Sequence, residues 1–485
     1  MSTLQLKDPT LFCEKALVNN QWVTAGSQKT ISVENPATGD VLGSVPEFDT
    51  KDTEVAIQAA SKAFASWKNT TAKQRHRLLM EWLRLIRENE DDLAKIMTLE
   101  NGKPLNEARG EVRYAASFIE WFAEEAKRLY GDIIPSPVND QRIMILKQPV
   151  GVVALLTPWN FPAAMITRKA GAALAAGCTA VIKPASQTPF SALALAKLAQ
   201  RAGFPEGVLN VITAHENLKS VSRHLCTHIS VKKVSFTGST HVGKILMEQS
   251  ASTLKKLSLE LGGNAPFIVF EDADVEKAVE GGLAAKFRNN GQTCVCVNRF
   301  YIHESVYDEF ATKFTERLRT YRVGNGLDPD VQLGPLIHKE ALEKVQAHVD
   351  DAVAKGAKVL TGGQALHDNF FAPTVLVNAT PDVDLHSEET FGPVAALFRF
   401  RTEEEVLQQA NDSTVGLASY CYTQNLSRMW RVVEALETGM VGINSSSVSH
   451  EVAPFGGIKE SGFGREGSKY GISEYVNVKY VNMSI

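Results

Sequence analysis

Cysteine is scarce in this chain, because six cysteines in 485 residues are too few for a disulfide framework. They fit a reducing compartment, and we expect a cytoplasmic protein in which cysteine serves packing or chemistry. No run of about 18 apolar residues occurs, so the sequence predicts no membrane span. The segment that begins at Met1 has neither a long apolar run behind a basic patch nor an Arg-rich composition. We therefore expect neither a signal peptide nor a transit peptide.

An excess of charge of either sign is also lacking. Lys and Arg number 51 and Asp and Glu number 55, which gives a net charge of -4. This balance gives no reason to expect nucleic acid or an anionic membrane surface as a partner. Hydrophobic residues make up 44% and charged residues 22%, as in ordinary soluble globular proteins. A chain of this length exceeds one hydrophobic core, so we expect two to four domains.

The pattern of apolar residues changes along the chain. Helical spacing dominates residues 50–68, 73–99 and 105–130. From Gly151 onward, short apolar runs alternate with helical stretches, which predicts an α/β fold with a parallel, doubly wound sheet. The predicted strands of this part are 152–156, 179–183, 208–212 and 233–236. Ligands bind at the carboxyl ends of such strands, where Asn160, Lys183, Ser186 and Ser239 fall.

A second α/β region follows. Its predicted strands are 266–270, 299–302, 374–377, 395–398 and 441–444. Two further strands, 141–148 and 475–481, stand apart from both regions. A lone strand of this kind is typical of an exposed hairpin that pairs with another subunit, although an ordinary edge strand has the same pattern.

One polar stretch, residues 287–298, interrupts the apolar sequence and presents Cys294. Asn289, Asn290 and Gly291 favour a turn, after which Thr293 and Cys294 open a helix or an extended segment. A thiol in such a loop is a candidate nucleophile, and Arg288 would lower its pKa. The local sequence also allows Cys294 to be a small buried hydrophobe.

Three other features are weaker signals by themselves. Gly238 and Gly243 have the outer spacing of a dinucleotide fingerprint without its middle glycine, so they form either a phosphate site at a helix N-terminus or a plain helix-starting turn. Lys183 ends an apolar strand, where it either faces solvent or meets an anion. Glu260 lies among leucines, where a desolvated carboxylate would act as a general base. Its alternative is a strand-edge glutamate in water.

Seven motifs occur together in a fixed order, and they are far more specific than any one alone. They lie at residues 157–162, 183–189, 236–239, 259–264, 291–294, 388–394 and 454–462. With these motifs the chain resembles the aldehyde dehydrogenase superfamily over nearly its whole length. The resemblance implies a Rossmann-like cofactor domain, an α/β catalytic domain and a small β oligomerisation flap.

The resemblance also implies the catalytic roles. Cys294 resembles the nucleophile that adds to an aldehyde as a thiohemiacetal. The Asn160 amide and the Cys294 backbone N–H resemble the oxyanion hole, whose donors contribute roughly 3–4 kcal/mol each. Loss of hydride to nicotinamide then leaves a thioester, and Glu260 resembles the base that activates water to hydrolyse it.

The cofactor implied is NADP or NAD. Trp159, Lys183, Ser186 and Ser239, with the turn at Gly238 and Gly243, resemble the adenosine and phosphate contacts, and Glu389 and Phe391 resemble the nicotinamide-ribose clamp. Many NAD-preferring relatives carry an acidic residue in place of Ser186. Because Ser186 does not repel a 2′-phosphate, we expect NADP to be accepted and NAD also to be used. The alternatives are a serine that only caps the following helix, and a dual-specificity site.

The substrate implied is a small aldehyde that carries a carboxylate. Arg168, Arg288 and Ser449 lie where the succinate-semialdehyde dehydrogenase pattern places its carboxylate contacts, and guanidinium groups hold carboxylates bidentately. Surface salt bridges are the alternative for either arginine. The alternative substrate is glutarate semialdehyde. The alternative function, from another functional class, is a non-catalytic binding or structural protein on the same fold.

Cys296 follows Cys294 by two residues, as in some members of that subfamily. Our hypothesis is that the two thiols form a disulfide under oxidation, and the alternative is a packed spectator. We expect no metal centre. The domains implied are 1–126 with 150–261 for the dinucleotide, 262–465 for catalysis, and 127–149 with 466–485 for a flap that builds a homotetramer or homodimer.

Overall fold

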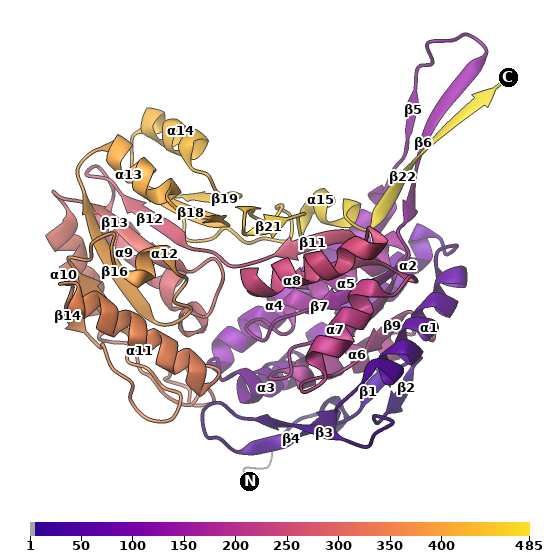
Figure 1. Ribbon diagram of the computed structural model, residues 1–485, viewed down its shortest axis with the longest axis horizontal. Coiled ribbons are helices and arrows are strands. Elements are labelled where there is room, and N and C mark those ends of the chain that lie inside the picture. The colour runs from indigo at the N-terminus through magenta and orange to yellow at the C-terminus, as the bar shows by residue number, and fades with distance from the viewer. Residues whose placement is uncertain (1–4) are drawn as a thin grey trace.

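The computed structural model describes residues 5–485, and residues 1–4, the start of the segment in which no targeting sequence is expected, lie outside this part. Figure 1 shows two α/β lobes side by side and an arm that projects from the first lobe. This arrangement confirms the predicted α/β fold class.

An eight-stranded sheet forms the first lobe. Its order is β2 (Gln21–Val23), β1 (Ala16–Val18), β9 (Leu209–Val211), β8 (Thr179–Lys183), β7 (Val152–Leu156), β10 (Val231–Thr237), β11 (Lys256–Glu260) and β21 (Gly462–Phe463). The five strands from β9 to β11 are parallel. β7 and β8 are buried along their whole length, which explains their unbroken apolar runs. The carboxyl ends of the parallel strands therefore share one edge, as predicted.

Helices cover this sheet. They are α1 (Thr50–Trp67), α2 (Ala72–Glu88), α3 (Glu90–Asn101), α4 (Leu105–Glu125), α5 (Ala164–Ala176), α6 (Pro189–Arg201), α7 (Leu218–Thr227) and α8 (Thr240–Ser250), with short 3-10 turns η1 (Pro9–Leu11), η2 (Ala126–Arg128) and η3 (Ala251–Thr253). The single helical pattern predicted over 73–99 is wrong. Asn89 leaves helical geometry (φ −106°, ψ 21°) and its side-chain amide donates to the Leu85 carbonyl, so the chain divides there into α2 and α3.

The second lobe has a seven-stranded sheet with helices around it. The sheet order is β14 (Lys358–Thr361), β15 (Thr374–Val377), β16 (Val394–Phe400), β13 (Val297–His303), β12 (Ala265–Val269), β18 (Ala418–Tyr422) and β19 (Met440–Ile443). The helices are α9 (Val275–Phe287), α10 (Tyr307–Leu318), α11 (Lys339–Ala354), α12 (Asp384–Ser387), α13 (Glu403–Asn411) and α14 (Leu426–Ala435), and the turn η4 (Arg288–Gly291) follows α9. The sheet is parallel from β15 to β19.

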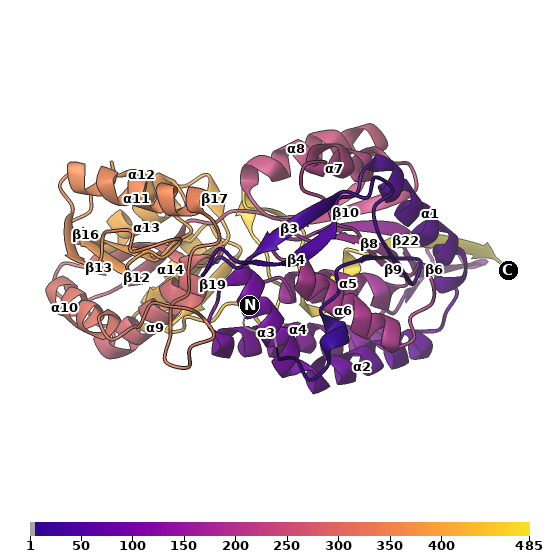
Figure 2. The same ribbon diagram turned by 90° about the horizontal axis from the view of Figure 1, so that it is seen from below.

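Three connections tie the lobes together. β21, near the end of the chain, pairs with β11 of the first sheet. The hairpin β3 (Thr30–Glu34)–β4 (Val41–Pro46) reaches the second lobe, where the Asn369 side chain donates to the Pro36 carbonyl at 3.1 Å (Figure 2). A two-stranded sheet of β17 (Val415–Gly416) and β20 (Ile458–Lys459) contacts β21, and α15 (Ser468–Ser473) follows.

The projecting arm is a three-stranded antiparallel sheet. β6 (Gln141–Pro149) pairs with β5 (Asp132–Ile134) on one side and with β22 (Val476–Ser484) on the other (Figure 1). Residues from distant parts of the chain thus build one ribbon within this chain, and the predicted pairing of these strands with another subunit stays a prediction. Ile133, Val478 and Tyr480 are exposed on it. Over residues 5–485, no helix has both the length and the apolar character needed to cross a membrane.

Candidate active site

A cavity of about 230 Å³ between the lobes brings together seven of the residues singled out in the sequence. Those residues are Trp159, Asn160, Gly238, Ser239, Cys294, Glu389 and Phe391. The segments after β7, β10 and β11 form its first wall, and the second lobe supplies the rest. The motifs that were scattered over more than 230 residues of sequence therefore form one site.

The backbone around Cys294 is set by tight turns. Asn289 and Asn290 have positive φ angles (50° and 55°) in η4, as their sequence preference for turns indicated. The predicted start of a helix or strand at Thr293 is wrong, because Cys294 lies in a turn closed by the Cys296 N–H and the Thr293 carbonyl at 2.8 Å. A Cβ on Gly263 would lie 2.3 Å from the Cys294 carbonyl oxygen, so only glycine lets the two segments approach.

The Cys294 thiol is protonated in this environment. Burial, and then the nearby Glu389 carboxylate, raise its pKa to about 12, while the Arg168 guanidinium acts in the opposite direction. Arg288 is not among the main influences on this pKa. The proposed activation of the thiol by Arg288 therefore receives no support, and Cys294 needs a base to become a thiolate.

Asn160 is held firmly beside the cysteine turn. Its side-chain amide donates to the Gln292 carbonyl at 3.0 Å, and its side-chain oxygen accepts from the Phe161 N–H at 3.1 Å. Its own carbonyl accepts from Lys103 Nζ at 2.7 Å. Lys103 is fully buried and paired with Glu111, whose other oxygen accepts from the Ala163 N–H at the start of α5. An amide has two N–H bonds, so one is left for a ligand.

Glu260 ends β11 and is buried, with 2% of its surface exposed. Neither carboxylate oxygen accepts a hydrogen bond from any described residue. Burial, reinforced by the Glu466 charge, raises its pKa well above the ordinary value, while Lys169 and Arg168 act against this rise. The alternative of a strand-edge glutamate in water is therefore wrong, and the role of this carboxylate as a general base stays a prediction.

Arg168 and Lys169 on α5 share the Glu466 carboxylate. The Arg168 Nε atom lies 3.2 Å from Glu466, and the Lys169 ammonium forms the second ion pair. Arg168 also donates to the Tyr114 hydroxyl at 2.8 Å, and that hydroxyl is hydrogen-bonded to Ser449 Oγ. Arg168 is thus a buried, engaged group rather than a surface ion pair, and Tyr114 connects it to Ser449.

Arg288 has a different setting from Arg168. No described residue accepts a hydrogen bond from its guanidinium or forms an ion pair with it, and it stacks on the Phe161 ring at 4.8 Å. It lines a second, small cavity with Thr293, Cys296 and Ser449, and Cys294 and Trp159 line the first cavity instead. The guanidinium is therefore free to take an anion there.

The predicted phosphate turn is the start of α8. Ser239 is the N-cap, and its hydroxyl accepts from the Val242 N–H at 3.3 Å. Gly238 and Ser239 line the cavity, so the N-terminus of α8 faces it. Gly243 does not line it. A Cβ there would lie 2.5 Å from the Leu261 side chain, which indicates that Gly243 serves close packing of α8 on the sheet.

Glu389 and Phe391 close the cavity from the second lobe. The Glu389 carboxylate accepts from the Gly263 N–H at 3.3 Å, and burial raises its pKa to about 7. Phe391 has a positive φ of 54°, and its ring meets that of Trp159 edge-on at 5.6 Å. A backbone held in this region costs about 1–3 kcal/mol, so the surrounding contacts must fix it.

Lys183 and Ser186 follow β8 at the shared strand edge. Lys183 is 7% exposed, and burial lowers its pKa to about 8 while the Glu47 carboxylate acts against this. No described carboxylate lies within ion-pair distance of it. Ser186 Oγ lies 3.1 Å from Nδ1 of His215, which follows β9. A buried ammonium without an ion partner is suited to an anionic ligand.

Cys296 is buried, and its thiol donates to the Lys286 carbonyl at 3.3 Å. Burial raises its pKa, and the Lys286 ammonium lowers it in part. Both thiols are free in this structure. A disulfide between Cys294 and Cys296 would require the Cys296 side chain to leave this hydrogen bond.

Sequence reasoning missed several members of the site. Lys103 bonds Asn160, and Tyr114 and Glu466 lie within hydrogen-bond or ion-pair distance of Arg168. Glu111 and Lys169 are one step further away, because they pair with Lys103 and Glu466. Lys169 adjoins Arg168, and a charged pair in the middle of an apolar helix was an available signal. Tyr114 gave no sequence signal of a role in the site, because 335 residues separate it from Ser449.

A model of the aldehyde dehydrogenase family matches residues 22–481. The chain belongs to the aldehyde dehydrogenase family and is an NAD(P)-dependent aldehyde dehydrogenase, which confirms the resemblance found in its motifs. It is 58% identical to a glutarate-semialdehyde dehydrogenase of Pseudomonas putida, over 99% of this chain and 100% of that protein. It is also 58% identical to a succinate-semialdehyde dehydrogenase (NADP) of Escherichia coli, over 99% of both chains. A crystal structure described as an NADP-dependent enzyme of Escherichia coli has a TM-score of 0.98 and 57% identity, covering 99% of this chain and 100% of that one.

Proposed function

We propose that this protein oxidises succinate semialdehyde to succinate with NADP or NAD. The observation that carries the proposal is the unpaired Arg288 guanidinium, which lines one cavity with Ser449 at the turn that presents Cys294. Relatives named for succinate and glutarate semialdehydes match this chain along almost its whole length, which supports an acid semialdehyde as the substrate class.

The residues around the larger cavity fit a dinucleotide. The α8 N-terminus offers backbone N–H groups to a phosphate, and Lys183 supplies an unpaired buried ammonium. Glu389 and Phe391 supply a carboxylate and a ring at the Cys294 end. When bound, the nicotinamide accepts the hydride that the substrate loses.

The chain itself supplies the remaining chemistry. Cys294 gives up its proton to a base and its sulfur bonds to the aldehyde carbon, while the free N–H of the Asn160 amide stabilises the developing oxyanion. Once hydride has left, a thioester links Cys294 to the acyl group. Glu260 takes a proton from water, the hydroxide adds to the thioester, and the C–S bond breaks to release the acid and the thiolate.

Substrate selection follows from charge at the far end of the site. Arg288 takes the substrate carboxylate, with Ser449 as a hydrogen-bond donor. Arg168 acts through Tyr114, which orients Ser449. Glutarate semialdehyde is the second candidate, because one methylene discriminates by only about 1–3 kcal/mol and a relative carries that name.

For the cofactor, we infer that NADP is accepted and NAD is also used. Ser186 carries no charge to repel a 2′-phosphate, and Lys183 lies on the same strand end. A kcat/KM for NADP more than tenfold below that for NAD would reject this inference.

We further propose that the arm makes the protein a homotetramer or homodimer, with 127–149 and 466–485 as the flap and the two lobes as the cofactor and catalytic domains. The exposed apolar residues of β5, β6 and β22 support this. Sedimentation of the intact chain tests it, and a monomer at micromolar concentration would contradict it.

The function is tested by following NADH and NADPH formation with succinate semialdehyde, glutarate semialdehyde and a series of neutral aldehydes. We expect the acid semialdehydes to have the highest kcat/KM, and the Cys294→Ala variant to have no activity with any of them. Equal kcat/KM for neutral aldehydes of similar length would overturn the substrate class.

A further inference from the structure

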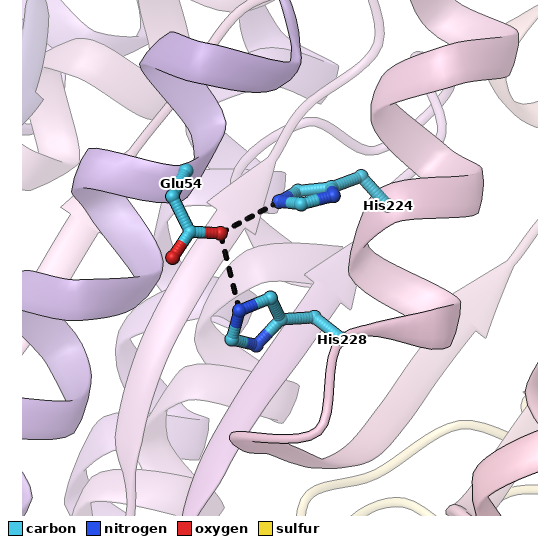
Figure 3. A group of neighbouring side chains, drawn as sticks. All are labelled: Glu54, His224 and His228. Atoms are coloured by element: carbon cyan, nitrogen blue, oxygen red, sulfur yellow. Dashed lines mark hydrogen bonds and ion pairs between the residues drawn. The ribbon is translucent and has the colours of Figure 1, made fainter.

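Two histidines and a glutamate converge on the outside of the first lobe, away from the site described above (Figure 3). Glu54 belongs to the first turns of α1, His224 to the last turn of α7, and His228 is the residue that ends α7. The ligand-type atoms of the three side chains all lie within 4.8 Å of one another. The proposed function assigns nothing to this cluster.

The geometry of the cluster is close to that of a metal site. Glu54 Oε2 lies 2.9 Å from His224 Nε2 and 3.1 Å from His228 Nε2. Tetrahedral zinc with bonds of about 2.0–2.1 Å to nitrogen and oxygen holds its ligand atoms about 3.4 Å apart. The two Glu54–histidine distances would have to lengthen by a few tenths of an ångström to admit the ion, and the two histidine nitrogens lie within 4.8 Å of each other.

The local sequence explains why the atoms converge. His224 and His228 are four residues apart, a spacing that places two side chains on one helical face. The second oxygen of Glu54 accepts from Gln58 Nε2 at 2.8 Å, which fixes the carboxylate plane. All three side chains are partly exposed, with 19–31% of their surface accessible, so an ion can enter and keep a water ligand.

One contact opposes metal binding and limits its strength. The Ser230 N–H donates to His228 Nδ1 at 3.1 Å, so the proton of the neutral ring sits on Nε2. A metal at Nε2 must move that proton to Nδ1 and break the Ser230 bond. The site would then suit a cation with a strong preference for imidazole rather than magnesium or calcium.

We propose that Glu54, His224 and His228 form a site for a divalent cation that prefers imidazole ligands, such as zinc, and that the bound ion links α1 to the end of α7. Neutral imidazole nitrogens and one carboxylate supply three ligands, and water supplies the fourth. We expected no metal centre from the sequence, in which 170 residues separate Glu54 from His224.

The test is zinc titration of the full-length protein by calorimetry, in a Cys294→Ser background so that the reactive thiol does not contribute. Glu54→Gln and His224→Asn remove one ligand each with little change in size. His367→Ala, an exposed histidine paired only with Asp368, is the matched control. We expect one zinc ion per chain, at least tenfold weaker binding in both cluster variants, and unchanged binding in the control.

Crystals soaked in zinc give a readout that does not depend on any variant. An anomalous difference peak among the three side chains would support the proposal, together with a Tm that rises with zinc in the Cys294→Ser protein and not in its Glu54→Gln derivative. Zinc binding of equal strength in both cluster variants, or a soaked crystal without a peak at this position, would overturn it.

Discussion

Lys103 donates a hydrogen bond from its buried ammonium to the backbone carbonyl of Asn160 at 2.7 Å. The same ammonium pairs with Glu111, and both side chains are 1% exposed. Glu111 in turn accepts from the backbone at the start of α5. A buried ion pair therefore fixes the backbone that carries the proposed oxyanion donor, and the Asn289 amide donates to the same carbonyl at 3.0 Å.

Replacing Lys103 by Met should lower kcat by about tenfold to a hundredfold, because a displacement of about 1 Å at the reacting centre has effects of that size. It should also destabilise the fold by about 3–5 kcal/mol, since Glu111 is left buried without a partner. The double variant Lys103→Met/Glu111→Gln separates the two effects. Its Tm should recover while kcat stays low, and recovery of both would show that Lys103 is only structural. Lys62→Met, on the exposed face of α1, is the control.

Tyr114→Phe should raise KM for succinate semialdehyde by about tenfold and leave KM for butanal unchanged. The variant removes the hydroxyl that bonds both Arg168 and Ser449, and a hydrogen bond to a charged group contributes about 1.5–3 kcal/mol. Steady-state kinetics with both aldehydes measures this. A parallel rise in both KM values would mean that Tyr114 shapes the site without serving the carboxylate.

Glu260→Gln should stabilise the protein at alkaline pH while it abolishes turnover. Folding raises the pKa of the Glu260 carboxyl. The protein therefore has its full stability below the pKa that this carboxyl has in the unfolded chain, and loses stability as the pH rises through the pKa of the folded state. The Tm gain of the variant should therefore be small at pH 4.5 and grow as the pH rises above that value. Wild-type kcat should rise over the same range, because the base must be ionised. A Tm difference that does not vary with pH would contradict this view of Glu260.

Ser186→Glu should lower kcat/KM for NADP by more than tenfold and spare NAD, since a carboxylate there repels a 2′-phosphate. Gln187→Glu adds the same charge one residue away and is the matched control. An equal loss in both variants would mean that the effect is general electrostatics and not recognition at Ser186.

The Cys296→Ala variant tests the redox hypothesis. We expect peroxide to inactivate the wild type reversibly, with activity restored by thiols, and to inactivate Cys296→Ala irreversibly, because Cys294 then lacks a resolving thiol. Irreversible inactivation of the wild type, or identical behaviour of the two proteins, would leave Cys296 as a packed spectator.

The parts of the site that short motifs encode could be predicted from the sequence. Cys294, Asn160 and Glu260 each follow a strand or a turn with a recognisable local pattern, and parallel strands bring such ends to one edge. The alternation of apolar strands and helices likewise predicted the first sheet. These features depend on a few neighbouring residues, which a single sequence displays.

Long-range partners could not be predicted in the same way. Glu466 joins Lys169 across 297 residues, and nothing near either residue specifies the other. The break at Asn89 was missed because the apolar stripe continues through it, and only the side-chain bond to Leu85 shows why the helix ends. For Gly243, the glycine spacing alone does not distinguish a phosphate contact from a helix start packed on the Leu261 side chain.

The most direct test of the account is the ratio of kcat/KM for succinate semialdehyde to that for butanal, measured in the wild type and in Arg288→Ala. Butanal has the same chain length and lacks the carboxylate, so the ratio reports only how strongly the enzyme binds the charged end of the substrate. Loss of a charge-assisted contact of about 1.5–3 kcal/mol should lower the ratio by about tenfold to a hundredfold. An unchanged ratio would contradict the claim that Arg288 selects an acid semialdehyde for attack by Cys294.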